Sequence, residues 1–399
     1  MEIYLFDWLN LLIRWLHVVA GIAWIGSSFY FIWLDNSLRP LSGGDDTGVA
    51  GEVWSVHGGG FYHARKFRTA PSPLPSPLHW FKWEAYTTWI SGFFLTVLVY
   101  WYGASVYLVD PSVLDVSPGV AVGLAAAFIV GGWVIYDLLC KSPLGRDDRV
   151  LAGLVFVLVS LLAWGLCQVF GGRGAYIHFG VVLGTIMVAN VAMVIIPGQR
   201  RMVTALENGE PVDPEDGRKG KQRSVHNTYF TLPVLFTMTS NHFAITYSHD
   251  YNWLILIAIS LAGALIRVYF VARHTKTARP VTLVAAGLLL VGVIVAVAPR
   301  PATSGTEAAA SIDDVRGVVL ARCTNCHAGV PSHPSFPSAP AGVVLESNAD
   351  ILANAARVYQ QTVVLRAMPI GNLTGITDGE RALVASWYEG LESMDGNNE

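Results

Sequence analysis

The chain has 399 residues, of which 53% are hydrophobic and only 14% are charged. Because soluble globular proteins carry roughly 25% charged residues, this composition excludes an ordinary soluble protein for most of the chain. The formal net charge is −3 and the sequence has no basic stripe, so the composition excludes nucleic acid as an expected partner.

Eight apolar segments are long enough to cross a lipid bilayer, which takes about 20 mostly apolar residues. The segments are 8–34, 84–107, 118–140, 149–170, 175–196, 228–247, 253–272 and 281–298. Tryptophan and tyrosine cluster at their ends, as at a membrane interface. The opening MEIYLFD lacks the basic segment of a cleavable signal, so we expect the first segment to be retained. The predicted fold class is therefore all-α, with a polytopic bundle of about eight transmembrane helices over 1–298.

Positive charges indicate the orientation of this bundle. Lysine and arginine are concentrated in the odd-numbered connections between segments, and the even-numbered ones contain only Arg173. Positively charged loops remain in the cytoplasm. We therefore expect the N-terminus and the C-terminal region to lie on the opposite side of the membrane.

The last hundred residues form a separate soluble domain in this interpretation. Residues 299–310 are rich in Pro, Thr, Ser and Ala and predict a flexible linker. The domain at 311–399 contains CTNCH at 323–327, a pattern typical of c-type haem attachment. Cys323 and Cys326 would bond the two vinyl groups, and His327 would ligate the iron. Met368, in a downstream Met-Pro loop, is the expected second iron ligand. The sequence thus predicts a class I c-type cytochrome with covalent haem c, and a zinc site is the alternative.

A group of polar residues is expected in the outer half of the bundle. His17, His178 and His242 lie at a similar depth in three segments, and Arg14 lies one turn before His17. A glycine one turn after His17 leaves flat space for a porphyrin, and Arg14 could pair with a propionate. We predict at least one b-type haem, with His17 and either His178 or His242 as iron ligands. Alternatively, His17 is a histidine hydrogen-bonded between helices.

A second polar group is expected at the inner ends of the segments. It is composed of histidines, cations, glycines and hydrogen-bonding side chains: His57, Gly58, Gly59, Gly60, Lys66, Lys82, Glu84, Arg223, His226, Asn227 and Tyr229. His226 and His242 are 16 residues apart, about 24 Å along a helix, so they cannot ligate one iron. The inner group predicts a cationic, aromatic pocket, and an ordinary basic cytoplasmic loop is the alternative.

Four motifs resemble the bacterial membrane-bound cytochrome c urate oxidases, also called urate hydroxylases. The motifs are LLIRWLHVVAGIAWIG at 11–26, VHGGGFY at 56–62, HWFKWEAY at 79–86 and HNTYFTLP at 226–233. The resemblance covers essentially the whole chain. It implies oxidation of urate to 5-hydroxyisourate without hydrogen peroxide. It also implies that electrons pass through membrane haem to a periplasmic cytochrome and on to a respiratory-chain acceptor such as a terminal oxidase, in the bacterial inner membrane.

The first segment is also similar to the membrane protoporphyrinogen oxidases, where His17 matches a haem-binding histidine and Lys82 matches an important lysine. If the protein oxidises urate, the inner pocket suits this planar anion. Its expected catalytic residues are His57, Lys82, Glu84, His226, Asn227 and Tyr229. Its expected substrate-binding residues are Gly58, Gly59, Gly60, Lys66 and Arg223. Two alternatives stay open: a quinol- or porphyrinogen-oxidising membrane haem protein, and a transporter with a tethered cytochrome.

Overall fold

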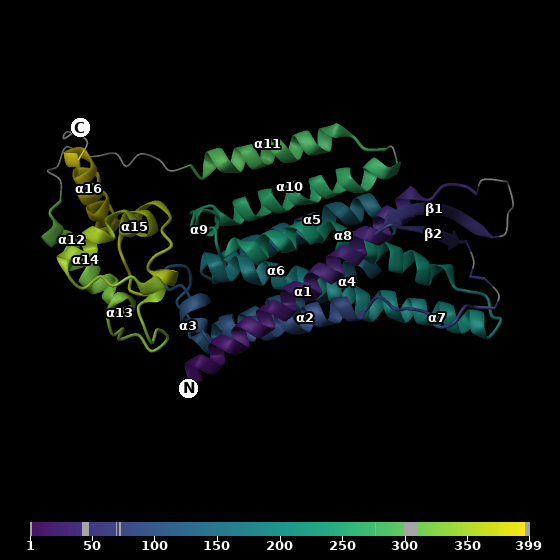
Figure 1. Cartoon of the computed structure of the whole chain (residues 1–399), viewed down its shortest axis with the longest axis horizontal. Coiled ribbons are helices and arrows are strands. Elements are labelled where there is room, and N and C mark those ends of the chain that lie inside the picture. The colour runs from purple at the N-terminus through teal and green to yellow at the C-terminus, as the bar shows by residue number, and fades with distance from the viewer. Residues whose placement is uncertain are drawn as a thin grey trace.

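The computed structural model describes residues 2–41, 48–68, 70–71, 73–275, 277–298 and 310–395. These residues form a long helical bundle with a small helical domain at one end and a β-hairpin at the other (Figure 1). The N-terminus lies at the same end as the C-terminal domain (Figure 1), which agrees with the arrangement predicted from the loop charges. The compartment that this end faces stays a prediction. The predicted linker lies outside the described residues, except for Ala310.

Among the described residues, five helical segments are long and apolar enough to cross a membrane. They are α1 (Glu2–Ser37), α4 (Pro118–Lys141), α5 (Asp148–Val169), α6 (Gly172–Ala189) with its continuation into α7 (Ile196–Glu207), and α10 (Asn252–Ala272). A sixth apolar helix, α11 (Pro280–Ala296), is shorter. Each of these helices overlaps one of the predicted segments, and several extend beyond its bounds, most of all α1 and the continuation of α6 into α7. The total of about eight crossings stays a prediction.

The other two predicted segments are less regular. Segment 84–107 is divided into α2 (Trp83–Leu95), a π-helical turn (Thr96–Trp101) and α3 (Ala104–Tyr107), with Gly103 outside helical geometry between them. Segment 228–247 belongs mostly to α8 (Pro214–Ser240), followed by α9 (Ala244–Tyr247). The first half of α8 is polar, so the apolar pattern alone did not indicate where this helix begins.

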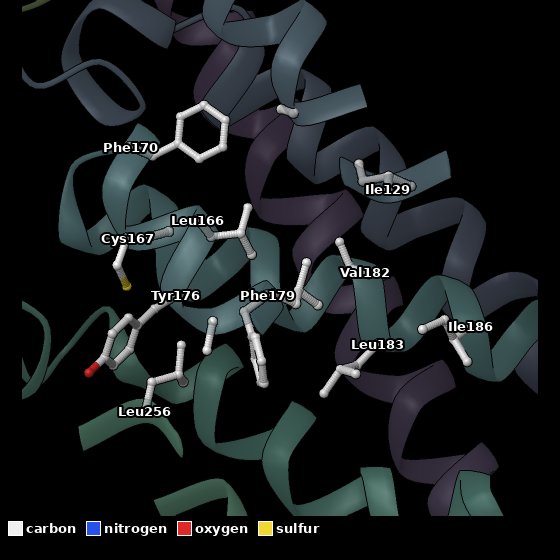
Figure 2. Packing of buried hydrophobic residues seen from close by; sticks show 14 of the residues in the cluster. Ile129, Leu166, Cys167, Phe170, Tyr176, Phe179, Val182, Leu183, Ile186 and Leu256 are labelled. Atoms are coloured by element: carbon white, nitrogen blue, oxygen red, sulfur yellow. The ribbon is translucent and has the colours of Figure 1, made fainter. Parts of the chain in front are cut away.

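The bundle is organised around α6, which is its most buried span. Side chains from α5, α6 and α10 interdigitate in its core, and Figure 2 shows Leu166, Phe179 and Leu183 among them. Gly180 allows α8 to approach closely, because a Cβ at this position would overlap the Thr237 hydroxyl. In contrast, α1 packs mainly on α2, and most of its surface is not covered by the other described residues.

The hairpin is an exception to the predicted all-α class. Strand β1 (Val49–His57) pairs antiparallel with β2 (Gly60–Phe67). Gly58 and Gly59 form the turn with φ angles of +57° and +81°, a conformation that favours glycine. The glycine run that we interpreted as a site of close approach to a ligand is therefore a hairpin turn in this structure.

The C-terminal domain has its own apolar core, which includes Val315, Ile351 and Trp387. Its helices are α12 (Ile312–Arg322), α13 (Thr324–His327), α14 (Asn348–Ala353), α15 (Ala355–Tyr359) and α16 (Asp378–Asp395). Ser311 and Asp314 form a capping box, which stabilises the start of α12.

Candidate functional site

One cavity of the C-terminal domain contains all four side chains predicted to hold haem c. Cys323, Cys326, His327 and Met368 line it, and it has about 530 Å³ of empty space that is partly open to solvent. His327 Nδ1 lies 2.8 Å from the Val343 carbonyl oxygen. Since a carbonyl only accepts, Nδ1 carries the proton and Nε2 keeps the lone pair that an iron ligand needs. This donor set fits a c-type haem.

The zinc alternative has less support. The described residues contain no group of three or more His, Cys, Asp or Glu side chains arranged to hold a metal ion. The Met368 backbone is fixed by its N–H donating to Gln361 and its carbonyl accepting from Arg381.

The same cavity reaches the membrane bundle. Val106 of α3 lines it together with the cysteines and Met368. The loop after Met368 contacts the backbone of α3, because a Cβ on Gly371 would lie 3.0 Å from the Val109 carbonyl oxygen and 3.5 Å from that of Val106. Such a contact between residues so far apart in the sequence was not predicted.

His17 packs between α1 and α2. Its Nδ1 lies 2.9 Å from the Thr88 carbonyl oxygen and 3.2 Å from Ser91 Oγ. The ring lies directly against Gly92 of α2, where a Cβ would lie 2.8 Å from His17 Cε1. The glycine that we had paired with His17, Gly21, instead faces Thr88.

The other outer residues are at separate positions. His178 is fully buried, with Nδ1 donating to the Gly174 carbonyl oxygen at 2.8 Å and Nε2 accepting from Trp101 at 3.3 Å. His242 lines a cleft between the bundle and the C-terminal domain. Arg14 donates to Asn10 at 3.0 Å. No contact among the described residues joins His17 to either of the other two histidines, so the b-haem ligand pair stays a prediction.

A chain of aromatic contacts connects α2 to the outer end. Trp89 stacks on Phe93 with ring centroids 5.4 Å apart, and Phe93 meets Trp101 at 5.6 Å. Trp101 then donates a hydrogen bond to His178. The His178 ring centroid lies 5.7 Å from that of Tyr100, and the Tyr100 centroid lies 6.2 Å from that of Tyr107. In order, the members are Trp89, Phe93, Trp101, His178, Tyr100 and Tyr107. The last lies in α3, next to the haem c cavity.

At the inner end, a large cavity lies between α1, α7, α8 and the segment that precedes α2. Of the predicted inner residues, Lys66, Asn227 and Tyr229 line it. Trp24, His79, Trp80 and Phe81 add aromatic surface to the lining. We call this space the inner pocket. Its combination of flat rings and amide, phenol and ammonium groups suits a planar polar ligand.

The remaining inner residues lie outside this lining. His57, Gly58, Gly59 and Gly60 are at the tip of the hairpin. Lys82 immediately follows Phe81, with its ammonium 5.7 Å from the centroid of the Trp83 ring, and Glu84 is in the first turn of α2. Arg223 is buried and pairs with Asp137 at 2.8 Å. The structure therefore brings together three of the predicted inner residues, and the roles of all of them stay predictions.

A buried polar network connects Arg223 to His226. Arg223 donates to Asp137 and to Asn190 Oδ1, the latter at 3.3 Å. Arginine only donates, so the Asn190 amide nitrogen faces the Tyr136 hydroxyl, 3.1 Å away. The Tyr136 hydroxyl lies 2.7 Å from His226 Nδ1, and which of the two donates depends on the tautomer of the histidine.

Sequence reasoning missed three members of this network, namely Tyr136, Asp137 and Asn190. Asp137 had a signal that could have found it, since an acidic residue inside an apolar segment is a functional candidate by default. Asn190 and Tyr136 carried no such signal, because their partners come from other helices.

A second cavity of the bundle is apolar and lies between α5, α8 and α10. His226 and Tyr229 line it, together with Ser160 and Ser260. Both serine hydroxyls are buried without a hydrogen-bond partner. Phe156 at its edge is 44% exposed on a spanning helix, so this cavity opens toward the surface that lipid would cover. We call it the lipid-side cavity.

Comparison with known proteins identifies a family. The family model described as urate oxidase N-terminal matches residues 3–298. This range includes the inner pocket, the buried network and the outer histidines, and it ends before the C-terminal domain. No curated protein and no solved structure matches the chain.

Proposed function

The chain belongs to the urate oxidase N-terminal family, and from this premise we propose that it oxidises urate to 5-hydroxyisourate in a bacterial inner membrane. Its electrons go to the fused cytochrome and then to a respiratory-chain acceptor such as a terminal oxidase. One observation carries this proposal: the cavity of Cys323, Cys326 and His327 also contains Val106 of the membrane bundle. An electron acceptor held there would lie directly against the part of the chain that matches the family.

The stoichiometry fits such an acceptor. Urate and water give 5-hydroxyisourate, two electrons and two protons, so the oxygen atom in the product comes from water. Haem, when bound, supplies one-electron transfer, and the two electrons leave in two steps. Since dioxygen is not needed at the site, no hydrogen peroxide is made.

The inner pocket is the proposed urate site. Trp24 and Phe81 offer aromatic faces for a planar purine, and Asn227 and Tyr229 offer hydrogen bonds to its edge. Lys66 contributes positive charge, although Asp35 lies 2.8 Å from its ammonium. Lys82 directly follows residues that line the pocket, so a small movement of this segment would bring a second cation to urate.

The buried network fixes the polar side of the pocket. Asn190 donates to Asn227 Oδ1 at 2.9 Å and accepts from Arg223. Asp137 pairs with Arg223 and also with Lys141 at 2.6 Å, where the side chain of Lys141 is 66% exposed. We propose that this network orients Asn227 toward urate, and that the two protons leave the pocket to water at the inner surface.

Electrons must travel in the opposite direction, across a hydrocarbon core of about 30 Å. The aromatic chain from Trp89 to Tyr107 spans the outer part of this path and ends beside Val106. The site formed by His17 and Gly92 lies next to this chain, since Gly92 immediately precedes Phe93. We propose that a b-type haem at His17 shortens the remaining gap.

The test uses purified full-length protein in the oxidised state. Anaerobic addition of urate should reduce the cytochrome absorbance, and aerobic turnover should give no hydrogen peroxide. Lys82→Ala and His226→Ala should abolish this reduction while both haem spectra stay intact. Lys219→Ala and His249→Ala are matched controls, because neither residue is among those expected to bind or oxidise urate. Full activity in Lys82→Ala and His226→Ala would mean that urate binds elsewhere.

A second candidate function, oxidation of a membrane-soluble quinol, is favoured by the lipid-side cavity. Its lining is apolar, while Ser260 offers a hydroxyl without a partner among the described residues and His226 offers its imidazole. These groups suit the oxygen atoms of a quinol. Anaerobic reduction of the cytochrome by a short-chain quinol, with no reduction by urate, would establish this alternative and exclude our proposal.

A further inference from the structure

Arg267 of α10 is a buried cation without an anionic partner. Its side chain is only 8% exposed, and its Nε and Nη2 atoms are buried with no hydrogen-bond partner. The guanidinium carbon lies 3.6 Å from the centroid of the Phe29 ring in α1. Tyr229 of α8 is close enough to interact with it electrostatically. Arg267 is therefore held between three helices by contacts that do not neutralise its charge.

A buried, unpaired charge raises the free energy of a membrane bundle. Charged side chains inside membrane helices are rare, and they normally pair with other groups or line a functional site. The buried Arg223 of this chain follows that rule through its ion pair with Asp137. A ring face attracts a cation only modestly, so Phe29 orients the guanidinium without replacing an anion.

The two unpartnered atoms belong to one edge of the guanidinium group. Nε and Nη2 point the same way, and this edge matches two coplanar acceptor atoms. Elsewhere in the chain, the same edge holds a carboxylate: Arg218 Nε and Nη2 donate to the two Glu215 oxygens at 3.0 Å and 2.9 Å. In Arg267 this edge has no ligand from the protein.

The surroundings connect Arg267 to the inner pocket. Tyr229 lines that pocket, as do Ser28, the neighbour of Phe29, and Val271, one turn after Arg267. Arg267 itself lies behind this lining, on the far side of Tyr229 from the pocket. Lys66, the cation of the lining that we had predicted, is already paired with Asp35, whereas the Nε–Nη2 edge of Arg267 has no hydrogen-bond partner among the described residues.

We propose that Arg267 binds a planar anion through its Nε–Nη2 edge at the inner pocket. Two ligands share this chemistry: the urate anion, which depends on the function proposed above, and the propionate of a b-type haem. Urate presents coplanar oxygen and nitrogen acceptors, and a propionate presents two oxygens. Tyr229 and Phe29 hold the guanidinium in place for either one.

The experiment measures urate affinity and haem content of purified full-length variants. Equilibrium dialysis with radiolabelled urate is done on dithionite-reduced protein, which cannot oxidise the ligand. Arg267→Gln and Arg267→Met should weaken urate binding at least tenfold. Arg267→Lys should have an intermediate affinity, because lysine keeps the positive charge but lacks the two parallel N–H donors of the guanidinium group. Arg273→Met is the matched control, since Arg273 is exposed at the end of the same helix and lies 5.3 Å from the Phe270 ring.

The outcomes separate the two ligands. Weaker urate binding with unchanged haem content identifies urate as the anion. Loss of b-type haem in Arg267→Gln, with Arg273→Met unaffected, identifies the propionate, even if the wild-type protein binds no urate and the proposed function fails. Unchanged urate affinity together with unchanged haem content in folded Arg267→Lys and Arg267→Gln would overturn the proposal.

Discussion

Gly371 of the C-terminal domain lies against the backbone of Val109, so that a Cβ on Gly371 would come within 3.0 Å of the Val109 carbonyl oxygen. Three residues before Gly371 is Met368, which lines the proposed haem c cavity. The close contact of these two backbones therefore fixes how near that cavity lies to the membrane bundle. Glycine at position 371 allows the two backbones to lie this close, and any side chain there would push them apart.

Replacing Gly371 should thus weaken the link between the domains. We expect Gly371→Val to slow reduction of the cytochrome by urate roughly tenfold or more, since small displacements of reacting groups have large kinetic effects. Stopped-flow absorbance measures the rate. Gly375→Val is the control, because Gly375 has a similar φ of +67° but its nearest neighbour is 3.9 Å away at Arg322. Equal rates in the two variants would mean that the contact has no role in electron transfer.

The second prediction concerns the covalent haem. Cys323→Ser with Cys326→Ser should remove haem peroxidase staining from the full-length band on a denaturing gel, whereas Cys140→Ser should keep it. Met368→His should retain the stain but lower the midpoint potential, because a thioether ligand raises the potential. An unstained wild-type band from a host with the maturation machinery would refute covalent attachment.

The sequence was most informative where one physical signal acts alone. Long apolar runs can satisfy their backbone only as helices in a membrane, so α4, α5 and α10 were predicted closely. CTNCH is similarly specific as a sequence pattern, because its spacing is typical of c-type haem attachment. In contrast, the glycine run before Phe61 is compatible with two structures, because glycine is favoured both in hairpin turns and where the backbone approaches a ligand closely. Only the pairing of β1 with β2 distinguishes them.

The inner site could be predicted only in part because its residues depend on partners from distant helices. The sequence places His226 and Asn227 side by side, but on a helix they point in different directions. Asn227 faces the inner pocket and His226 faces the lipid-side cavity. Likewise, no local pattern shows that Arg223 is neutralised by Asp137 while Arg267 is not.

The third prediction concerns the b-type haem. His17→Ala should remove it, because His17 provides the expected iron ligand. Pyridine haemochrome analysis separates b-type from c-type haem. His178→Ala and His242→Ala then identify the opposite ligand, and His249→Ala, in a connection, is the control. Active protein with only c-type haem would contradict this prediction.

The last prediction tests the ion pair between Asp137 and Arg223. Their side chains are only 10% and 4% exposed, and the charged atoms are 2.8 Å apart. Removing one member leaves the other charge buried and unpaired, which typically costs about 3–5 kcal/mol. Asp137→Leu should therefore lower the free energy of unfolding in detergent by about that amount, measured by fluorescence during titration with a denaturing detergent.

The double variant Asp137→Leu with Arg223→Leu distinguishes a buried pair from a simple packing defect. Because both charges are then absent, we expect it to recover much of the stability that the single variant loses. The exposed pair of Arg218 and Glu215, 2.9 Å apart, is the matched control, and Glu215→Gln should change stability by about 0–1 kcal/mol. If the double variant is as unstable as the sum of the single variants, the two side chains act independently. If it regains stability but no longer reduces its cytochrome with urate, the pair serves the reaction rather than the fold.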